Sequence, residues 1–323
     1  MPLSRERLER ESALTGFRPD ILEKVAYLLA LLEGFNRHPF LKGKLALKGG
    51  TALNLFVFDV PRLSIDIDLN YIGAVEREGM LQERPRIEEA ITAVCQREGL
   101  LLQKMPNEHA GGSWSLRYNS VFGNSENIKV DVVYMYRVPL WSPVVQDSKP
   151  VGTLVAKQVL VLDEYELVAG KLSALFVRQT SRDLFDAHAL LMKRSLEPER
   201  LRLAFVIYGA MNRKDWRTVR IDDIERAATE FESYLLPLLR KGTLEVSQDS
   251  GLWASTLTSE CKAALEQVLP LRENELMFLQ RLLDAGEIEP EHITEDTELA
   301  ERVCRHPDLL WKAMHVKKHY GIL

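Results

Sequence analysis

Residues 47–69 read LKGGTALNLFVFDVPRLSIDIDL and combine a glycine turn with two closely spaced acids. Within and just beyond this segment, residues 64–73 alternate polar and apolar side chains, which predicts a β-strand. Side chains two residues apart on a strand project to the same face, so Asp66 and Asp68 stand side by side, about 7 Å apart along the chain. The apolar residues between them face the opposite way, toward a core.

The paired carboxylates indicate a metal site. Two like charges held this close repel each other, and a divalent cation resolves the conflict. Hard oxygen ligands suit Mg²⁺, which keeps several waters and takes substrate phosphates as further ligands. The other interpretation is two solvated carboxylates on an exposed strand face, and the acid pair alone does not decide between them.

The upstream motif Lys48-Gly49-Gly50-Thr51 ends one strand and opens a helix. Glycines there let backbone N–H groups approach a phosphate, a helix N-terminus favours anions, and the Thr51 hydroxyl adds a donor. A tight turn with a helix cap at Thr51 explains the same residues. A phosphate cradle followed by an acid pair is a joint pattern that favours nucleotide chemistry.

A third acid, Asp131, lies in the alternating segment 128–133 (IKVDVV). If that strand pairs beside the strand of Asp66 and Asp68, three carboxylates converge and two metal ions could be held. Asp131 could instead end a partly exposed strand face. The sequence leaves this choice to the strand pairing.

The rest of the chain divides into two parts. The first half mixes helical and strand patterns; from about Asp163 onward the helical period dominates. We therefore expect an α+β protein, with an α/β domain over residues 1–160 and a helical domain over 161–323 that completes the active-site cleft. The predicted strands are 101–105, 113–119 and 127–135, and the predicted helices are 22–32, 51–58, 85–98, 165–177, 182–193, 198–211, 221–239, 259–269 and 273–286.

Composition excludes several classes of protein. The chain has 323 residues, 46% hydrophobic and 28% charged, with a net charge of -5, so it is neither disordered nor a generally basic nucleic-acid coat. Three distant cysteines form no CxxC pair, which argues against a zinc ribbon or a disulfide framework. The charged start lacks an apolar signal region, and no apolar run approaches bilayer length. We expect a cytoplasmic protein with no membrane partner.

Two further features stay ambiguous. Residues 193–220 carry eight basic and three acidic side chains with aromatic residues interleaved, which fits an RNA contact or an ordinary charged helix face. Lys312, Lys317 and Lys318 near the C-terminus have the same ambiguity. His315 and His319 have the i, i+4 spacing of a metal pair, but a polar helix face explains that spacing better.

The chain resembles the polymerase-β-type nucleotidyltransferase superfamily, and within it the AbiEii/AbiGii toxin family that includes the MenT toxins. The resemblance is carried by residues 47–53 (LKGGTAL), 62–69 (RLSIDIDL), 129–131 (KVD), 166–175 (ELVAGKLSAL) and 182–186 (RDLFD), and loosely by 307–312 (PDLLWK). It implies a polymerase-β-like nucleotidyltransferase domain with a mixed sheet, followed by the helical domain.

The resemblance also implies roles for particular residues. Asp66, Asp68 and Asp131 would bind Mg²⁺; Lys171 would neutralise the triphosphate. Asp183 and Asp186 would line the nucleotide pocket, Asp183 among the catalytic groups. The remaining nucleotide-binding positions implied are Lys48, Gly49, Gly50, Thr51, Arg62 and Ser64. From the residues alone, Lys171 could equally sit on a solvated helix face, and Asp183 could serve a helix start capped by Ser181.

The implied function is an Mg²⁺-dependent toxin that transfers NMP from an NTP, of pyrimidine type, to the 3′ end of tRNA and so blocks translation. The toxin would belong to a toxin–antitoxin or phage-defence system with a cognate antitoxin partner. One rival is a small-molecule, antibiotic-type nucleotidyltransferase, which would need no RNA path. The other is a catalytically inactive binding protein that keeps the fold.

Overall fold

The computed structural model describes residues 3–58, 62–104, 111–193, 195–228, 231–243 and 250–321. Its contacts divide the chain into two compact units. Unit 1 comprises Met1–Arg137, Pro143–Leu162 and Pro237–Val246; unit 2 comprises Val138–Ser142, Asp163–Leu236 and Ser247–Leu323. Among the described residues, none of the helices combines the length and apolarity that a membrane crossing requires.

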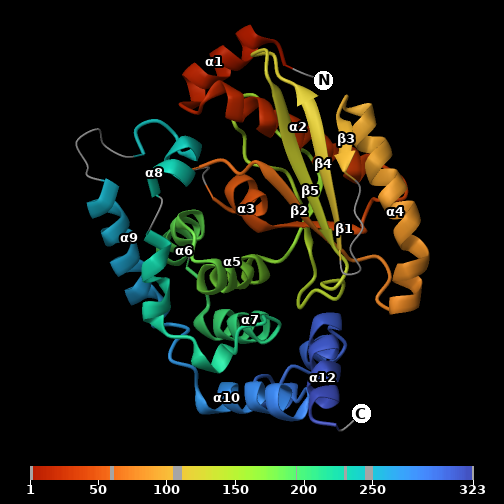
Figure 1. Cartoon of the computed structure of the whole chain (residues 1–323), viewed down its shortest axis with the longest axis vertical. Coiled ribbons are helices and arrows are strands. Elements are labelled where there is room, and N and C mark those ends of the chain that lie inside the picture. The colour runs from red at the N-terminus through yellow and green to blue at the C-terminus, as the bar shows by residue number, and fades with distance from the viewer. Residues whose placement is uncertain are drawn as a thin grey trace. The chain divides into compact units, whose positions relative to one another are not determined.

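Unit 1 is built on a seven-stranded mixed sheet (Figure 1). The strand order is β3-β4-β5-β2-β1-β7-β6; β2 is parallel to β5 and β1 to β7, whereas the other neighbours are antiparallel. The strands are β1 Leu45–Lys48, β2 Asp66–Tyr71, β3 Leu101–Lys104, β4 Gly111–Asn119, β5 Ser125–Val133, β6 Val144–Gln146 and β7 Val159–Val161. The mixed sheet and the α+β class predicted from the sequence are confirmed.

The helices of unit 1 are α1 Arg5–Thr15, α2 Pro19–Arg37, α3 Gly49–Ala52 and α4 Arg77–Arg97, and a π-helical turn, Leu53–Val57, continues α3. The α2 helix packs on β7 and α4, and α4 packs on β3. Alternation along the strands buries Ile67, Leu69, Val130 and Val132 completely or nearly so. This apolar face fixes the opposite orientation of the acids between them.

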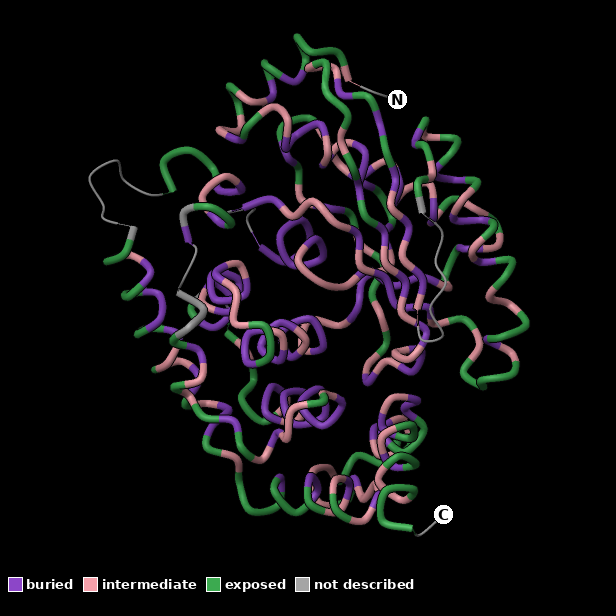
Figure 2. Tube along the Cα trace, viewed as in Figure 1, coloured by how far each residue is buried: buried purple, intermediate pink, exposed green. Residues whose placement is uncertain are grey.

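Unit 2 is helical, as the period of its sequence predicts. Its elements are α5 Glu164–Arg178, α6 Ser181–Lys193, α7 Pro198–Ala210, α8 Phe231–Tyr234, α9 Ser250–Leu265, α10 Glu273–Gln280, α11 Thr297–Cys304 and α12 Pro307–His319. Short 3₁₀ or π turns occupy Trp216–Thr218, Ile221–Ala228, Leu236–Leu238, Arg281–Ala285 and Pro290–His292. The α5 helix packs against α6 and α7, and buried positions gather along α5 and α7 (Figure 2).

Three predicted helices differ from the structure, and the one predicted over 85–98 begins earlier, at Arg77. The helix predicted over 221–239 is a 3₁₀ segment, Ile221–Ala228, followed by the four-residue α8, with residues 229–230 outside the described part. Asp223 accepts from the Lys214 ammonium and the Arg220 N–H. Pro237 prevents continuation at the far end. The helix predicted over 259–269 instead begins at Ser250 and ends at Leu265.

Candidate active site

The acid pair on β2 has the predicted geometry. Asp66 and Asp68 are half-buried and alternate with Ile67 and Leu69, which are 0% and 2% exposed. The apolar partners fix the strand's orientation, so both carboxylates project to the same face of the sheet.

The third acid lies beside the pair. Strand β5 runs parallel to β2 with Asp131 directly opposite Asp68 and Lys129 opposite Asp66. Directly opposed residues share a face of the sheet, so Asp66, Asp68, Asp131 and Lys129 project together. The strand pairing on which the three-acid prediction depended is therefore present.

Lys129 is the counter-ion of this cluster, a role that the sequence analysis missed. Its ammonium lies 2.6 Å from Asp131 Oδ2. The hydrogen bond to Asp131 raises the pKa of Lys129 against the opposing effect of burial, and Asp66 and Asp68 add to the rise. The sequence pattern indicates this role, because Lys129 lies two residues before Asp131 and therefore on the same strand face.

The donor set fits a hard divalent cation. Three carboxylates and one lysine leave an excess of negative charge, and Asp131 Oδ1 is buried with no hydrogen-bond partner among the described residues. Within those same residues, no group of three or more His, Cys, Asp or Glu side chains is placed to hold a metal ion together. Mg²⁺ does not need one, because it binds through one or two carboxylates together with waters and substrate phosphates.

The glycine turn lies against the acid cluster. Gly49 has φ +71°, and a Cβ there would collide with the Asp68 carboxylate, so only glycine fits this position. A Cβ on Gly50 would lie 3.1 Å from Ser64 Oγ and 3.2 Å from the Arg62 guanidinium. The turn thus gathers the predicted nucleotide-binding residues of β1, α3 and the segment before β2 in one place.

Thr51 is fully buried and its hydroxyl donates to the main-chain carbonyl of Asp66. That bond connects the start of α3 to strand β2. The Thr51 hydroxyl, which the sequence predicted to donate to a phosphate, donates to this carbonyl instead. The N–H groups of the first helical turn have no intrahelical acceptor and remain the donors of this turn. The Asn54 side chain donates to the Gly50 carbonyl at 2.7 Å and holds the turn from inside.

The two basic residues of the turn are placed differently. Lys48 is opposite Asp68 in the β1–β2 ladder, and its ammonium lies 5.1 Å from the centre of the Tyr136 ring. Arg62 is 3% exposed and donates to the Leu63 carbonyl at 3.1 Å, while its backbone pairs with Leu239.

A second cluster lies inside unit 2. Lys171 on α5 is 7% exposed, and its ammonium lies 3.0 Å from Asp183 and 2.9 Å from Asp186, both on α6. Arg178 reaches Asp183 at 2.8 Å, and the Thr180 hydroxyl donates to Asp183 at 2.7 Å. Lys171 is therefore not on a solvated face.

The charges of this second cluster are mutually stabilised. Burial acts to raise the pKa of Asp183, but Lys171, Arg178 and Thr180 together hold it below its ordinary value. At the start of α6, the Thr180 hydroxyl accepts the Asp183 N–H, so Thr180 takes the capping place that the sequence suggested for Ser181. Arg178 and Thr180 are the members that sequence reasoning missed.

The predicted site residues thus form two groups. Lys48, Gly49, Gly50, Thr51, Arg62, Ser64, Asp66, Asp68 and Asp131 belong to unit 1, and Lys171, Asp183 and Asp186 belong to unit 2. Each group is assembled by contacts within its own unit.

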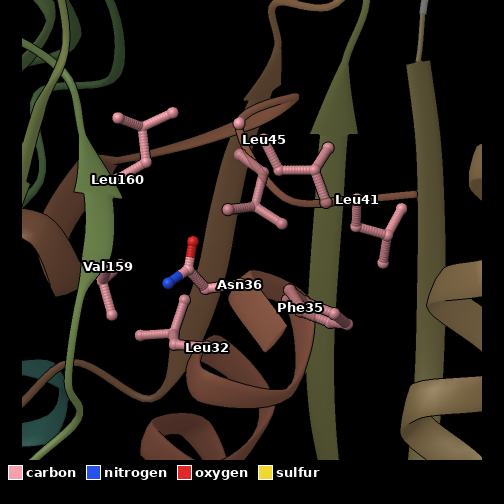
Figure 3. Close-up of a pocket in the computed structure, with 9 residues that line it drawn as sticks. Leu32, Phe35, Asn36, Leu41, Leu45, Val159 and Leu160 are labelled. Atoms are coloured by element: carbon pink, nitrogen blue, oxygen red, sulfur yellow. The ribbon is translucent and has the colours of Figure 1, made fainter. Parts of the chain in front are cut away.

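A small apolar cavity in unit 1 is unsuited to a nucleotide. Nine residues line it, among them Leu32, Leu45 and Leu160, and the Asn36 amide is their one polar side chain (Figure 3). Its volume of about 10 Å³ is that of a single water at most. The strand acids and the glycine turn do not line it.

Comparison with known proteins gives a family and a fold for the chain. The family model described as nucleotidyl transferase AbiEii toxin of type IV toxin–antitoxin systems matches residues 30–258. Among solved structures, the chain is similar to MenT4, a nucleotidyltransferase toxin from Mycobacterium tuberculosis H37Rv, at 17% identity and a TM-score of 0.61. That match covers 94% of this chain and 98% of MenT4. A search of curated protein sequences finds no match.

Proposed function

We propose that this chain, which belongs to the AbiEii nucleotidyl transferase toxin family, transfers a nucleoside monophosphate from an NTP to the 3′ end of tRNA. The observation that carries the proposal is the strand register that aligns Asp68 with Asp131 beside Asp66, against the Gly49 turn. Enzymes of phosphoryl transfer combine backbone donors that bind phosphate with carboxylates that bind divalent metal ions. The proposed donor is a pyrimidine nucleotide.

Asp66, Asp68 and Asp131 are the residues that would hold Mg²⁺. When bound, the metal supplies charge neutralisation for the triphosphate and lowers the pKa of the attacking hydroxyl. The orphaned Oδ1 of Asp131 supports this assignment, because a buried carboxylate oxygen without a donor is costly unless a cation satisfies it.

The chain's own groups bind and orient the nucleotide. The N–H groups of Gly49, Gly50 and Thr51 donate to phosphate oxygens at the start of α3, with Arg62 and Ser64 beside the turn. Asp131 accepts or orients the proton of the attacking hydroxyl. In-line attack on the α-phosphate then forms the new phosphodiester bond and releases pyrophosphate.

Lys171 is assigned to the triphosphate, with Asp183 and Asp186 as the groups that fix its position. In the structure the Lys171 ammonium is buried and paired with both of these carboxylates. Because these ion pairs also stabilise unit 2, the activity of a Lys171 variant is measured together with its stability.

A cognate antitoxin is the proposed protein partner, and the proposed setting is the cytoplasm, where arrest of translation limits phage growth. The type IV system named by the family model supports the antitoxin. MenT4 is described as a nucleotidyltransferase toxin, which supports the same reading of this chain.

The test uses the purified chain with Mg²⁺, total tRNA and each of the four α-³²P-labelled NTPs in turn. We expect label on the 3′ ends of tRNA with CTP or UTP, and none with the Asp68→Asn variant. Asp147→Asn is the matched control, because Asp147 is an exposed acid of unit 1, paired with Lys157 and remote in sequence from the cluster.

Two outcomes would replace the proposal. Label on members of an antibiotic panel and not on tRNA would identify a small-molecule nucleotidyltransferase. No label on any acceptor, together with equal growth inhibition by wild type and Asp68→Asn, would identify a binding protein.

A further inference from the structure

The basic segment 193–220 does not offer a free cationic surface. Its described cations are mostly used inside unit 2: Arg200 pairs with Asp163, Arg202 with buried Glu275, Lys214 with Asp223, Arg217 with Asp215 and Asp284, and Arg220 donates to two backbone carbonyls. These interactions hold helices together. The phosphates of a bound RNA would therefore pair with basic residues outside this segment.

The exposed face of α12 has the composition that such a contact needs. Leu310, Trp311, Met314, His315 and Lys318 recur at helical spacing and are all exposed, Trp311 by 46%. The ring centres of Trp311 and His315 lie 3.9 Å apart, and His315 Nδ1 lies 2.8 Å from the Trp311 carbonyl oxygen. The two rings therefore form a fixed aromatic platform, which we call the Trp311 face.

The last turn of α12 carries positive charge. Neither Lys317 nor Lys318 forms an ion pair within the described residues, and His319 lies next to them. Along α12 itself, the one acid is Asp308, in the first turn. Unpaired cations beside an aromatic platform match a polyanion with flat bases better than they match a neutral protein surface.

The Trp311 face is tied to the helix of Lys171. From α12, Lys312 donates to the carbonyls of Ala210, at 2.6 Å, and Asn212, and burial lowers its pKa. The Asn212 side chain in turn donates at 2.5 Å to Ser173, two residues after Lys171 on α5. An RNA strand held on α12 would thus be held on the same compact unit as Lys171. Lys312 itself is a structural residue.

We propose that the Trp311 face binds single-stranded RNA of the acceptor, with a base stacked on Trp311 and a phosphate paired with Lys318. This inference rests on the proposed function for the identity of the acceptor, and it adds the place where the acceptor is held. A protein partner on the same face, either an antitoxin or a second copy, is the competing occupant that the test must separate.

The test measures fluorescence anisotropy of a short fluorescein-labelled single-stranded RNA of mixed sequence with the full chain. We expect Trp311→Ala to weaken binding about tenfold through loss of stacking, and Trp311→Phe to retain most of the affinity. Lys318→Gln should lower the slope of log affinity against log salt by about one. The matched controls are Tyr234→Ala, an aromatic residue 55% exposed on α8, and exposed Lys42→Gln.

Equal RNA binding by wild type and Trp311→Ala would overturn the proposal. So would a wild-type chain that binds no RNA, or a change in sedimentation of Trp311→Ala without a change in RNA affinity, which would indicate that a second copy of the chain occupies this face. The failure of the proposed function is a separate result: RNA binding that depends on Trp311 without nucleotide transfer refutes the function and keeps the RNA surface. Transfer to RNA that Trp311→Ala leaves unchanged refutes the surface alone.

Discussion

Replacing Lys171 with methionine removes the ammonium that Asp183 and Asp186 share, and it should destabilise the helical unit by about 3–5 kcal/mol. The side chains of the three residues are 7%, 3% and 0% exposed, so water cannot replace the lost cation. Arg178 still reaches Asp183, but its own side chain is 59% exposed. The estimate is a large share of the 5–15 kcal/mol that stabilises a typical domain.

The effect should depend on pH in a defined direction. Because the folded-state pKa of Asp183 is held low, its ion pair contributes stability above the ordinary pKa of aspartate and loses it as pH falls through the folded value. The difference between wild type and Lys171→Met should therefore be full at pH 7 and should narrow below about pH 4.

Urea unfolding followed by tryptophan fluorescence measures the stability of unit 2, which contains Lys171. Of the five tryptophans, Trp114 belongs to unit 1 and the other four to unit 2. Trp216, fully buried, packs with its ring centre 5.8 Å from that of Phe176 on α5. If the free energy of unfolding falls by about 2 kcal/mol per molar urea, the urea concentration at the midpoint of unfolding should fall by about 2 M.

Lys262→Met is the matched control, because Lys262 also bridges two acids, Asp222 and Glu225, but on the surface. Its midpoint should move little, since exposed ion pairs contribute little to stability. Equal shifts for the two lysine variants would refute the argument from burial. A second check is the double variant Lys171→Met/Asp186→Asn, which removes one of the two buried negative charges that faced Lys171 and should be more stable than Lys171→Met alone.

Three further predictions concern other groups. Gly49→Ala should cost about 1–2 kcal/mol in urea unfolding, because alanine resists the positive φ and its Cβ meets Asp68. Lys129→Met should bind Mn²⁺, followed by electron paramagnetic resonance, up to about fivefold more tightly, because the lysine competes for Asp131. Burial raises the pKa of Glu166 to about 7 despite hydrogen bonds that lower it. An acid whose pKa is raised in the folded state destabilises the fold as pH rises from about 4.5 to 7, by at most about 1.4 kcal/mol per pH unit. The melting temperature of Glu166→Gln should lack that pH dependence.

Each of these has an outcome that contradicts it. Gly43→Ala places alanine at a similar positive φ, +76°, with nothing within 4 Å, so an equal loss there would show that the Asp68 clash is irrelevant. Lys157→Met, which breaks an exposed pair with Asp147, should leave Mn²⁺ affinity unchanged, and weaker Mn²⁺ binding by Lys129→Met would exclude competition. A Glu166→Gln variant whose melting temperature follows pH as the wild type does would remove Glu166 as the titrating group.

Local periodicity made much of unit 1 predictable. Alternation over 64–73 and 128–133 gave strands with the acids on one face, because neighbouring side chains on a strand must point in opposite directions. The glycine turn was recognisable because few residues other than glycine adopt the φ of Gly49. The AbiEii family and the α+β class, expected from the same segments, are both confirmed.

Helix prediction failed where apolar spacing did not fix the pattern of backbone hydrogen bonds. Residues 221–228 have the apolar spacing of an α-helix, yet they form a 3₁₀ segment. The short strands β6 and β7 also escaped prediction, since three residues are too few for a period to be visible.

By itself, the sequence determined which side chains share a strand face or helix turn, because those relations depend only on backbone geometry over a few residues. Tertiary structure decided the rest: that Asp131 stands opposite Asp68, that Thr51 donates to the acid strand, and that Lys171 is buried between two carboxylates. These contacts join residues 12 to 63 positions apart, and only packing selects them among the many pairings that the local patterns allow.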